Sequence, residues 1–252
     1  MKLEKIVKYL DEFLNVSNVS DAALNTLQIE GCEELETIGL AVDFCMQTIQ
    51  AAIDNKCQML ICHHGQFWPS LGALTGSTYK RVKMMMDNNI SLYASHLPLD
   101  MHPEIGNNAV IMKMLDLKYK DTFAMYHGQK IGIIAESERL QELNAFQKNF
   151  DKIFDTESIL IKSDNGKAQI KTVGIVSGGA AKEVEEASNL GLDLYITGEP
   201  SHAEFHMVKE GNTHMLCGGH YKTEATGIQA LGKNLEQNFG LKTIFFDIPT
   251  GL

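Results

Sequence analysis

The sequence predicts an α/β protein with two related β-α-β-α-β units, whose mainly parallel sheets are covered by helices, and a small inserted α/β segment. Two short apolar runs rich in β-branched residues, 38–43 and 173–178, each precede a stretch with helical spacing and then a second apolar strand. The interval from Gly39 to His63 equals the interval from Gly174 to Gly198. This repeat of strand and helix favours parallel strands joined by right-handed crossovers.

The elements follow one another in the same order in both halves. An N-terminal amphipathic helix is expected first, from apolar residues at helical spacing among charges. In the first half we then expect strands at 38–43, 59–64 and 90–95, with helices at 45–56 and 79–88. In the second half we expect strands at 173–178 and 214–218 and a strand that ends at 198, with helices at 181–190 and 203–211.

The segment between the halves, residues 120–171, reads as an inserted subdomain. It contains short strand-like runs at 130–134 and 158–161, a polar amphipathic helix at 139–150, and a turn at Ser163-Asp164-Asn165-Gly166. The predicted division is therefore a first α/β unit at 1–119, the insertion at 120–171, and a second α/β unit at 172–252.

Composition narrows the classes of partner. The 252 residues carry a formal net charge of −10, which repels phosphate backbones, so nucleic acid is an unfavoured partner. Five cysteines, an odd number without Cys-x-x-Cys spacing, indicate reduced thiols in a cytoplasm. The N-terminus lacks the uncharged stretch of a signal peptide, and no apolar run approaches the roughly 18 residues of a membrane span.

Imidazoles and carboxylates gather where the predicted strands end. His63 and His64 close one apolar run, Asp100 lies shortly after another, and His220 and Glu224 follow a third. The carboxyl ends of parallel strands meet at one edge of a sheet, and divalent cations take these side chains as ligands. We therefore predict a dinuclear metal site. The plainer alternatives are a hydrogen-bonded histidine pair, a surface turn acid and a polar first turn of a helix.

Local sequence supports these five ligands. Adjacent strand residues point to opposite faces, so both histidines reach one site only if the chain leaves the strand, which Gly65 permits. His220 and Glu224 are four residues apart, which places them on one face of a helix. Pro98 stiffens the loop that carries Asp100.

Other polar and aromatic residues have two interpretations each. His96 is either a proton shuttle or ligand-orienting residue for the site or an ordinary hydrogen-bonded histidine, and Glu199 either positions a ligand or water or is a helix N-terminal acid. His202 and His206 have helical spacing, which on a surface helix favours solvation over metal binding. Phe67-Trp68 would either stack on a flat substrate or fill a core or subunit contact.

Several separated motifs, in one order and nearly end to end, resemble the YbgI-like dinuclear metal-binding family, often labelled "GTP cyclohydrolase 1 type 2 homolog". Gly65 and Leu97-Pro98 depart from the His-His-Pro and Thr-Asn steps of many relatives, and the ligand positions are unchanged. The motifs are His63-His64-Gly65-x-Phe67-Trp68, His96-Leu97-Pro98-Leu99-Asp100, Ile196-Thr197-Gly198-Glu199 and Gly219-His220-x-x-Thr223-Glu224.

The resemblance implies that His63, His64, Asp100, His220 and Glu224 bind two metals, with Glu224 bridging. It also implies a toroidal homohexamer with the metal sites facing an internal cavity. The donor types suit Zn, Mn, Fe, Co or Ni about equally.

Two adjacent cations would generate hydroxide from water near neutral pH, which favours a metal-dependent hydrolase acting on a small nucleotide-like or cyclic amide substrate, with Glu224 and His96 as catalytic residues. Ser177-Gly178-Gly179 is the one candidate phosphate cradle. A protein that stores, delivers or senses metal, and an assembly scaffold, are the alternative functions.

Overall fold

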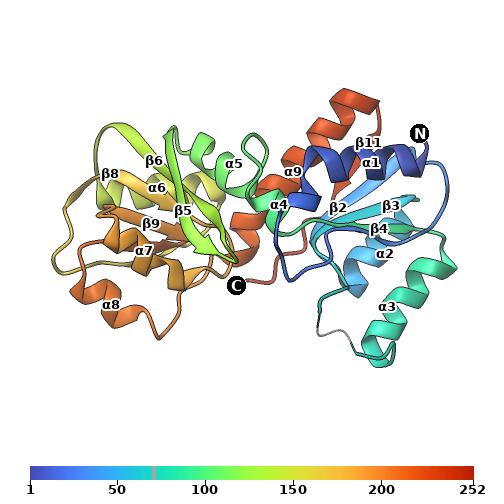
Figure 1. Cartoon of the computed structure of the whole chain (residues 1–252), viewed down its shortest axis with the longest axis horizontal. Helices are drawn as coiled ribbons and strands as arrows, with labels where there is room; N and C mark the ends of the chain where they lie inside the picture. The colour runs from blue at the N-terminus through green and yellow to red at the C-terminus, as the bar shows by residue number, and fades with distance from the viewer. Residues whose placement is uncertain (70–71) are drawn as a thin grey trace. The chain divides into compact units, whose positions relative to one another are not determined.

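The computed structural model describes residues 1–69 and 72–252 and confirms an α/β fold with two helix-covered sheets (Figure 1). Contacts divide the chain into two compact units. Unit 1 comprises Met1–Ile105 and Gly227–Ile248, and unit 2 comprises Gly106–Thr226 and Pro249–Leu252.

Unit 1 is built on a five-stranded sheet in the order β1-β4-β3-β2-β11. The four strands from β4 to β11 are parallel, and only the edge strand β1 runs antiparallel. Parallel strands that are buried on both faces have continuous apolar sequences, and this pattern predicted the strands at 38–43 and 59–64. The strands are β1 (Thr26–Ile29), β2 (Thr37–Asp43), β3 (Met59–His64), β4 (Ser91–Ala94) and β11 (Lys242–Phe245).

Helices cover both faces of this sheet. On one face α2 (Met46–Asp54) and α3 (Gly76–Asp87) pack through Ile49 and Met85 against Leu60. On the other face lie α1 (Leu3–Phe13) and residues 227–239 of α9 (His220–Phe239), where a Cβ at Gly232 would overlap Leu40. A short helix, α4 (Leu97–Asp100), follows β4, and a 3-10 turn, η1 (Val16–Asn18), follows α1.

Unit 2 contains a six-stranded mixed sheet in the order β5-β6-β8-β9-β10-β7. Its central strands β8, β9 and β10 are parallel, while β5, β6 and β7 pair antiparallel. The strands are β5 (Lys118–Tyr126), β6 (Gln129–Glu142), β7 (Ile159–Ile161), β8 (Gln169–Ile175), β9 (Leu194–Thr197) and β10 (His214–Cys217).

The unit 2 core lies between this sheet and two helices, α5 (Asn107–Met114) and α6 (Leu143–Phe154). Phe146, Phe150 and Phe154 recur every four residues, so they form one face of α6 and pack on the sheet. The opposite face carries η2 (Ala181–Glu183), α7 (Val184–Asn189) and α8 (Phe205–Glu210) (Figure 1).

The structure corrects the prediction for residues 139–150. Residues 139–142 complete β6, and α6 starts at Leu143 because the Glu142 carboxylate accepts hydrogen bonds from the backbone N–H groups of Asn144 and Ala145. Segment 120–171 also shares one sheet with residues 172–217, through the β6–β8 and β10–β7 pairs. These antiparallel pairs join strands far apart in sequence, so local periodicity does not reveal them.

Asp193 anchors the start of β9 to β8. Its buried carboxylate accepts hydrogen bonds from the backbone N–H groups of Lys171 and Thr172, from the Thr172 hydroxyl and from Lys167 Nζ. Burial raises the pKa of Asp193, but these donors outweigh burial and lower it. Its stabilising contribution is therefore present above the ordinary value of 3.8 and is lost as pH falls through the lowered pKa.

We expect Asp193→Asn to lower the free energy of unfolding by about 1.5–3 kcal/mol at neutral pH. The asparagine has no negative charge, and its NH₂ group would face the N–H, hydroxyl and ammonium donors that now bind the carboxylate. Urea denaturation measures the change, which should shrink in acid. Asp164→Asn is the control, since Asp164 is an exposed partner of Lys209 and its loss should cost less than about 1 kcal/mol. Equal effects of the two substitutions would contradict the anchoring role.

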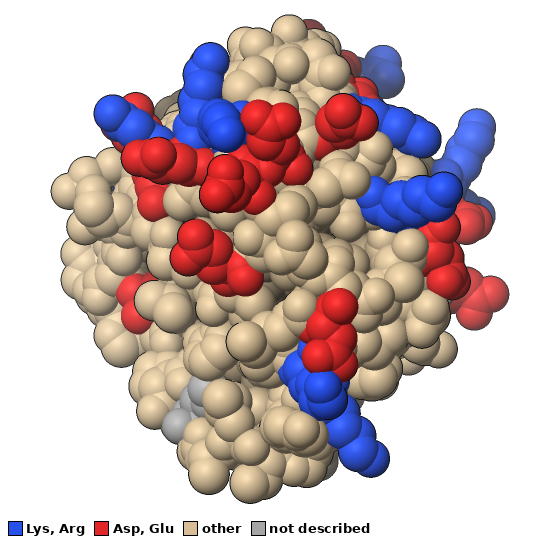
Figure 2. Space-filling model, turned by 90° about the vertical axis from the view of Figure 1, so that its right-hand side faces the viewer, with Lys and Arg blue, Asp and Glu red and all other residues tan. Residues whose placement is uncertain are grey.

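On the face drawn in Figure 2, basic side chains stand beside acidic ones, and the described residues form no continuous basic patch there. Among the residues that the structure describes, no helix is both long enough and apolar enough to cross a membrane.

Candidate metal centre

Four side chains of unit 1 form one group, here called the His63 cluster: His63, His64, His96 and Asp100. His63 and His64 end β3, His96 precedes α4, and Asp100 ends α4. The ring centroid of His63 lies 4.8 Å from that of His64 and 5.1 Å from that of His96. Nitrogens of the three imidazoles lie within 4.8 Å of one another, and His63 Nε2 is 3.5 Å from Asp100 Oδ2. The arrangement is able to hold a metal ion.

Each imidazole of the His63 cluster is held through Nδ1. His63 Nδ1 donates to the backbone oxygen of Ser95 at 2.9 Å, His64 Nδ1 lies 2.8 Å from Asp43 Oδ1, and His96 Nδ1 lies 3.0 Å from Asp21 Oδ2. A carbonyl or carboxylate oxygen accepts, so the proton sits on Nδ1. Nε2 then carries the lone pair that coordinates a cation, as in metal-ligating histidines.

Strand register brings Asp43 to His64. The two residues are direct partners in the β2–β3 pair, and both end their strands. Gly65 follows with a conventional backbone, and its role is close approach, because a Cβ there would lie 2.5 Å from Ala94 Cβ and 2.6 Å from the Gln28 amide. The glycine therefore lets the chain pass against β4 and β1 directly after the histidine pair.

Asp21 comes from a loop before β1 and reaches His96 across the sequence. Besides His96 it accepts hydrogen bonds from Asn25 Nδ2 and from the backbone N–H groups of Ala23 and Leu97. Burial raises the pKa of Asp21, but His96, Asn25 and Ala23 together lower it well below its ordinary value. Asp21 is therefore ionised and fixes the His96 ring.

Unit 2 carries a second group, here called the His220 cluster: Glu199, His220 and Glu224. His220 begins α9 and Glu224 lies one turn later, as the spacing predicted. His220 Nδ1 is 2.5 Å from Glu199 Oε1, and His220 Nε2 is 3.0 Å from the buried Glu224 carboxylate. The Nδ1 arrangement of the His63 cluster is thus repeated.

The loop at Gly178 supports the His220 cluster. Gly178 has φ of +70°, donates its N–H to Thr223 Oγ1 at 3.0 Å and accepts from Thr197 Oγ1 at 3.0 Å. The Ser177 N–H donates to Asn108 Oδ1 at 2.8 Å. The N–H groups of Ser177 and Gly178 are therefore already donated, and the loop supports α9 through Thr223.

Protonation of His220 opposes metal binding. Burial lowers the pKa of His220, but Glu224 and then Glu199 outweigh burial and raise it to about 9. The protonated His220 therefore stabilises the metal-free fold. This contribution is fully present below pH 6.5, the ordinary pKa of histidine, and is lost as pH rises through the raised pKa of about 9.

We expect the affinity of the His220 cluster for Zn²⁺ to rise about tenfold per pH unit from neutral pH and to flatten near pH 9, because a cation must displace one proton. Chelator competition at several pH values measures this. In Glu199→Gln the flattening should shift to lower pH, since one of the two carboxylates that raise the pKa is gone. An affinity independent of pH up to 9 would contradict the protonated state.

The sequence did not predict a role for Asp21 or Asp43. Asp21 belongs to an N-terminal motif, Asp21-x-x-x-Asn25, that also resembles the family, and Asp43 stands at a strand end. Phe67 packs against the unit 1 core, whereas the Trp68 ring meets His96 edge-on with centroids 5.2 Å apart. His202 and His206 are exposed, beside and on α8, and lie outside the metal-binding groups found among the described residues.

The fold and the site together define the class of protein. It is an α/β protein with two helix-covered sheets and with candidate metal-binding histidines that are held through Nδ1. The chain belongs to the Duf34/NIF3 (NGG1p interacting factor 3) family, which it matches over residues 1–251.

Relatives match over the whole chain. A protein of Pyrococcus horikoshii named "GTP cyclohydrolase 1 type 2 homolog" is 42% identical, with full coverage of both chains. The solved structure of protein ybgI, titled as of unknown function, superposes with a TM-score of 0.94 at 30% identity and full coverage of both chains. The structure of TTHA1606 from Thermus thermophilus gives a TM-score of 0.90 at 33% identity, again with full coverage.

Proposed function

We propose that His63, His64, Asp100, His220 and Glu224 bind two divalent cations, with Glu224 bridging them, and that the protein is a metal-dependent hydrolase. One observation carries the proposal: the three histidines of this ligand set have Nδ1 hydrogen-bonded to an oxygen acceptor, at Ser95, Asp43 and Glu199. Metal-ligating histidines have this outer partner. The donor set suits Zn, Mn, Fe, Co or Ni.

Bound divalent cations would lower the pKa of water and so supply a nucleophile near neutral pH. His96 is the residue that we assign to proton transfer, because the ionised Asp21 holds its Nδ1 and leaves Nε2 to accept a proton. Glu199 holds the ring of His220 in the same way. Glu224, buried beside His220 Nε2, supplies the negative charge that offsets a cation.

The proposed substrate is a small nucleotide-like molecule or cyclic amide. Support comes from the family and from the name "GTP cyclohydrolase 1 type 2 homolog" that its curated relatives carry.

The test is elemental analysis of protein purified without added metal, followed by a screen of nucleotides and cyclic amides with the metal found. We expect two ions per chain and turnover that His96→Asn reduces without metal loss. His202→Asn is the control, because His202 is exposed and lies before α8. Rapid metal exchange without turnover of any substrate would contradict the hydrolase and favour a metal-delivery protein.

We also propose that the protein acts in the cytoplasm as a toroidal homohexamer. All five cysteines are free, which suits a reducing compartment. The hexamer is supported by the family resemblance, and native mass spectrometry tests it.

A further inference from the structure

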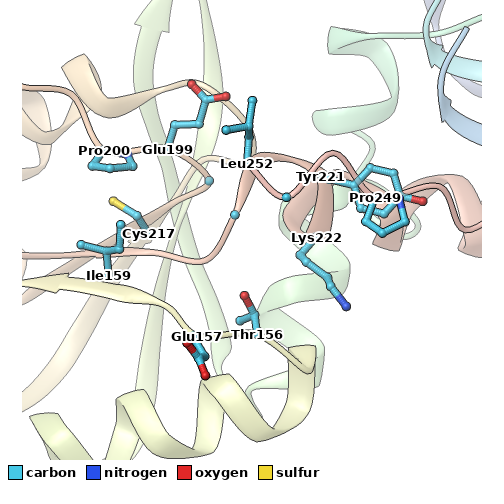
Figure 3. Close-up of a pocket in the computed structure, with 13 residues that line it drawn as sticks. Thr156, Glu157, Ile159, Glu199, Pro200, Cys217, Tyr221, Lys222, Pro249 and Leu252 are labelled. Atoms are coloured by element: carbon cyan, nitrogen blue, oxygen red, sulfur yellow. The ribbon is translucent and has the colours of Figure 1, made fainter. Parts of the chain in front are cut away.

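A groove of about 740 Å³ lies in unit 1 between helix α1 and strand β1, and is here called the α1–β1 groove. Its described lining residues include no member of the His63 cluster, so the groove is separate from the proposed metal site. The cavity beside the His220 cluster is different, because Glu199 of that cluster lines it (Figure 3). That cavity therefore belongs to the site already described.

One side of the α1–β1 groove is the edge strand of the unit 1 sheet. Among the described strands β1 pairs with β4 alone, so the backbone N–H and C=O groups on its outer edge have no strand partner. Leu27 of β1 and Leu3 and Val7 of α1 give the groove an apolar lining. An extended segment can add to such an edge, with its backbone bonded to the strand and its alternate side chains in the groove.

The α1–β1 groove carries an excess of negative charge, because five acids and two lysines line it. Lys2 lies 3.7 Å from Glu33, and Lys8 lies 3.9 Å from Glu12. All four of these side chains are more than half exposed. Such surface pairs are weak, so the two glutamates can exchange their lysines for a cationic ligand at small cost.

The other three acids of the groove have no cationic partner among the residues that the structure describes. The Asp11 carboxylate accepts hydrogen bonds from the hydroxyls of Thr26, at 3.1 Å, and Tyr93, at 2.9 Å, and both donors are neutral. These bonds fix the carboxylate beside β1 and leave its charge without an offsetting cation. Glu4 and Glu30 are exposed. The three carboxylates therefore favour a ligand that brings ammonium or guanidinium groups.

We propose that the α1–β1 groove binds a basic, extended segment of another protein, which adds a strand to β1 and places lysine or arginine side chains on Asp11, Glu4 and Glu30. The charge selects this occupant over a second copy of the chain, whose own net charge is −10. No proposed metal ligand lines the groove, so binding of the segment requires neither metal nor turnover.

The experiment is fluorescence anisotropy of the full-length protein with a labelled, acetylated peptide of eight residues in which lysine and valine alternate. We expect binding to weaken about tenfold or more when glutamate replaces lysine, because the groove then repels the peptide. Complete N-methylation of the peptide backbone should weaken binding by a similar factor, because it removes the donors of strand addition. Added salt should also weaken binding, because it screens the charges.

Two variants of the protein test the location. Glu30→Lys reverses an exposed charge of the groove and should weaken peptide binding about tenfold. Asp54→Lys is the matched control, because Asp54 is exposed at the end of α2, on the other face of the sheet, and the substitution changes the net charge equally.

Equal binding of the lysine and glutamate peptides would overturn the inference, and so would equal affinities of the Glu30→Lys and Asp54→Lys proteins for the lysine peptide. Sedimentation velocity with and without peptide tests the alternative occupant. Release of subunits from an assembly by the peptide would show that a second copy fills the groove, and would also overturn the inference.

Discussion

Glu224→Gln is expected to reduce turnover and the affinity for the more weakly held cation on the order of 100-fold or more, since loss of even an outer partner of a metal ligand costs 10–100-fold. The substitution keeps the shape of the side chain and removes its negative charge. Glu224 is buried and lies 3.0 Å from His220 Nε2, so its charge also raises the pKa of His220. The measurements are metal stoichiometry by elemental analysis and steady-state rates in the native metal.

Glu236→Gln is the matched control on the same helix, because Glu236 is exposed and its carboxylate accepts hydrogen bonds from the Thr243 hydroxyl and backbone N–H, within unit 1. We expect that variant to keep both ions and full turnover. Circular dichroism separates loss of metal from loss of fold. A folded Glu224→Gln protein that retained two ions and normal rates would refute the proposed ligand role.

Much of the fold follows from local patterns because parallel strands buried on both faces leave continuous apolar runs. Residues 38–43, 59–64 and 173–178 coincide with β2, β3 and β8 to within a few residues. Edge strand β1 and the β6–β8 pair were not predicted, since their partners lie far along the chain and their pairing depends on tertiary contacts. The start of α6 depended on a single carboxylate, that of Glu142, which ends β6 and caps the helix.

Residue type predicts ligand candidates better than it predicts the residues that orient them. Histidines at strand ends stand out in a sequence, whereas Asp21 and Asp43 look like ordinary loop and strand-end acids. Asp21 meets His96 across 75 residues, and Asp43 meets His64 through the register of two parallel strands. Neither contact has a local signature, although together they decide which imidazole nitrogen can bind a metal.

Gly178→Ala is expected to lower the free energy of unfolding by about 1–3 kcal/mol and the metal affinity of the His220 cluster about 10–100-fold. Two effects combine in this variant. The backbone at Gly178 has φ of +70°, which an L-residue adopts with strain, and the added Cβ would overlap Glu224 Oε1. The carboxylate would have to move away from His220.

Gly191→Ala separates strain from displacement of Glu224. Gly191 has φ of +68°, and an added Cβ there meets nothing within 4 Å, so this variant carries the backbone strain alone. We expect both variants to lose stability in urea denaturation and only Gly178→Ala to lose metal in chelator competition. This difference in metal affinity is expected because the Gly178 N–H donates a hydrogen bond to Thr223, one residue before Glu224. If the two variants bound metal equally well, the loop would be a turn without influence on the His220 cluster.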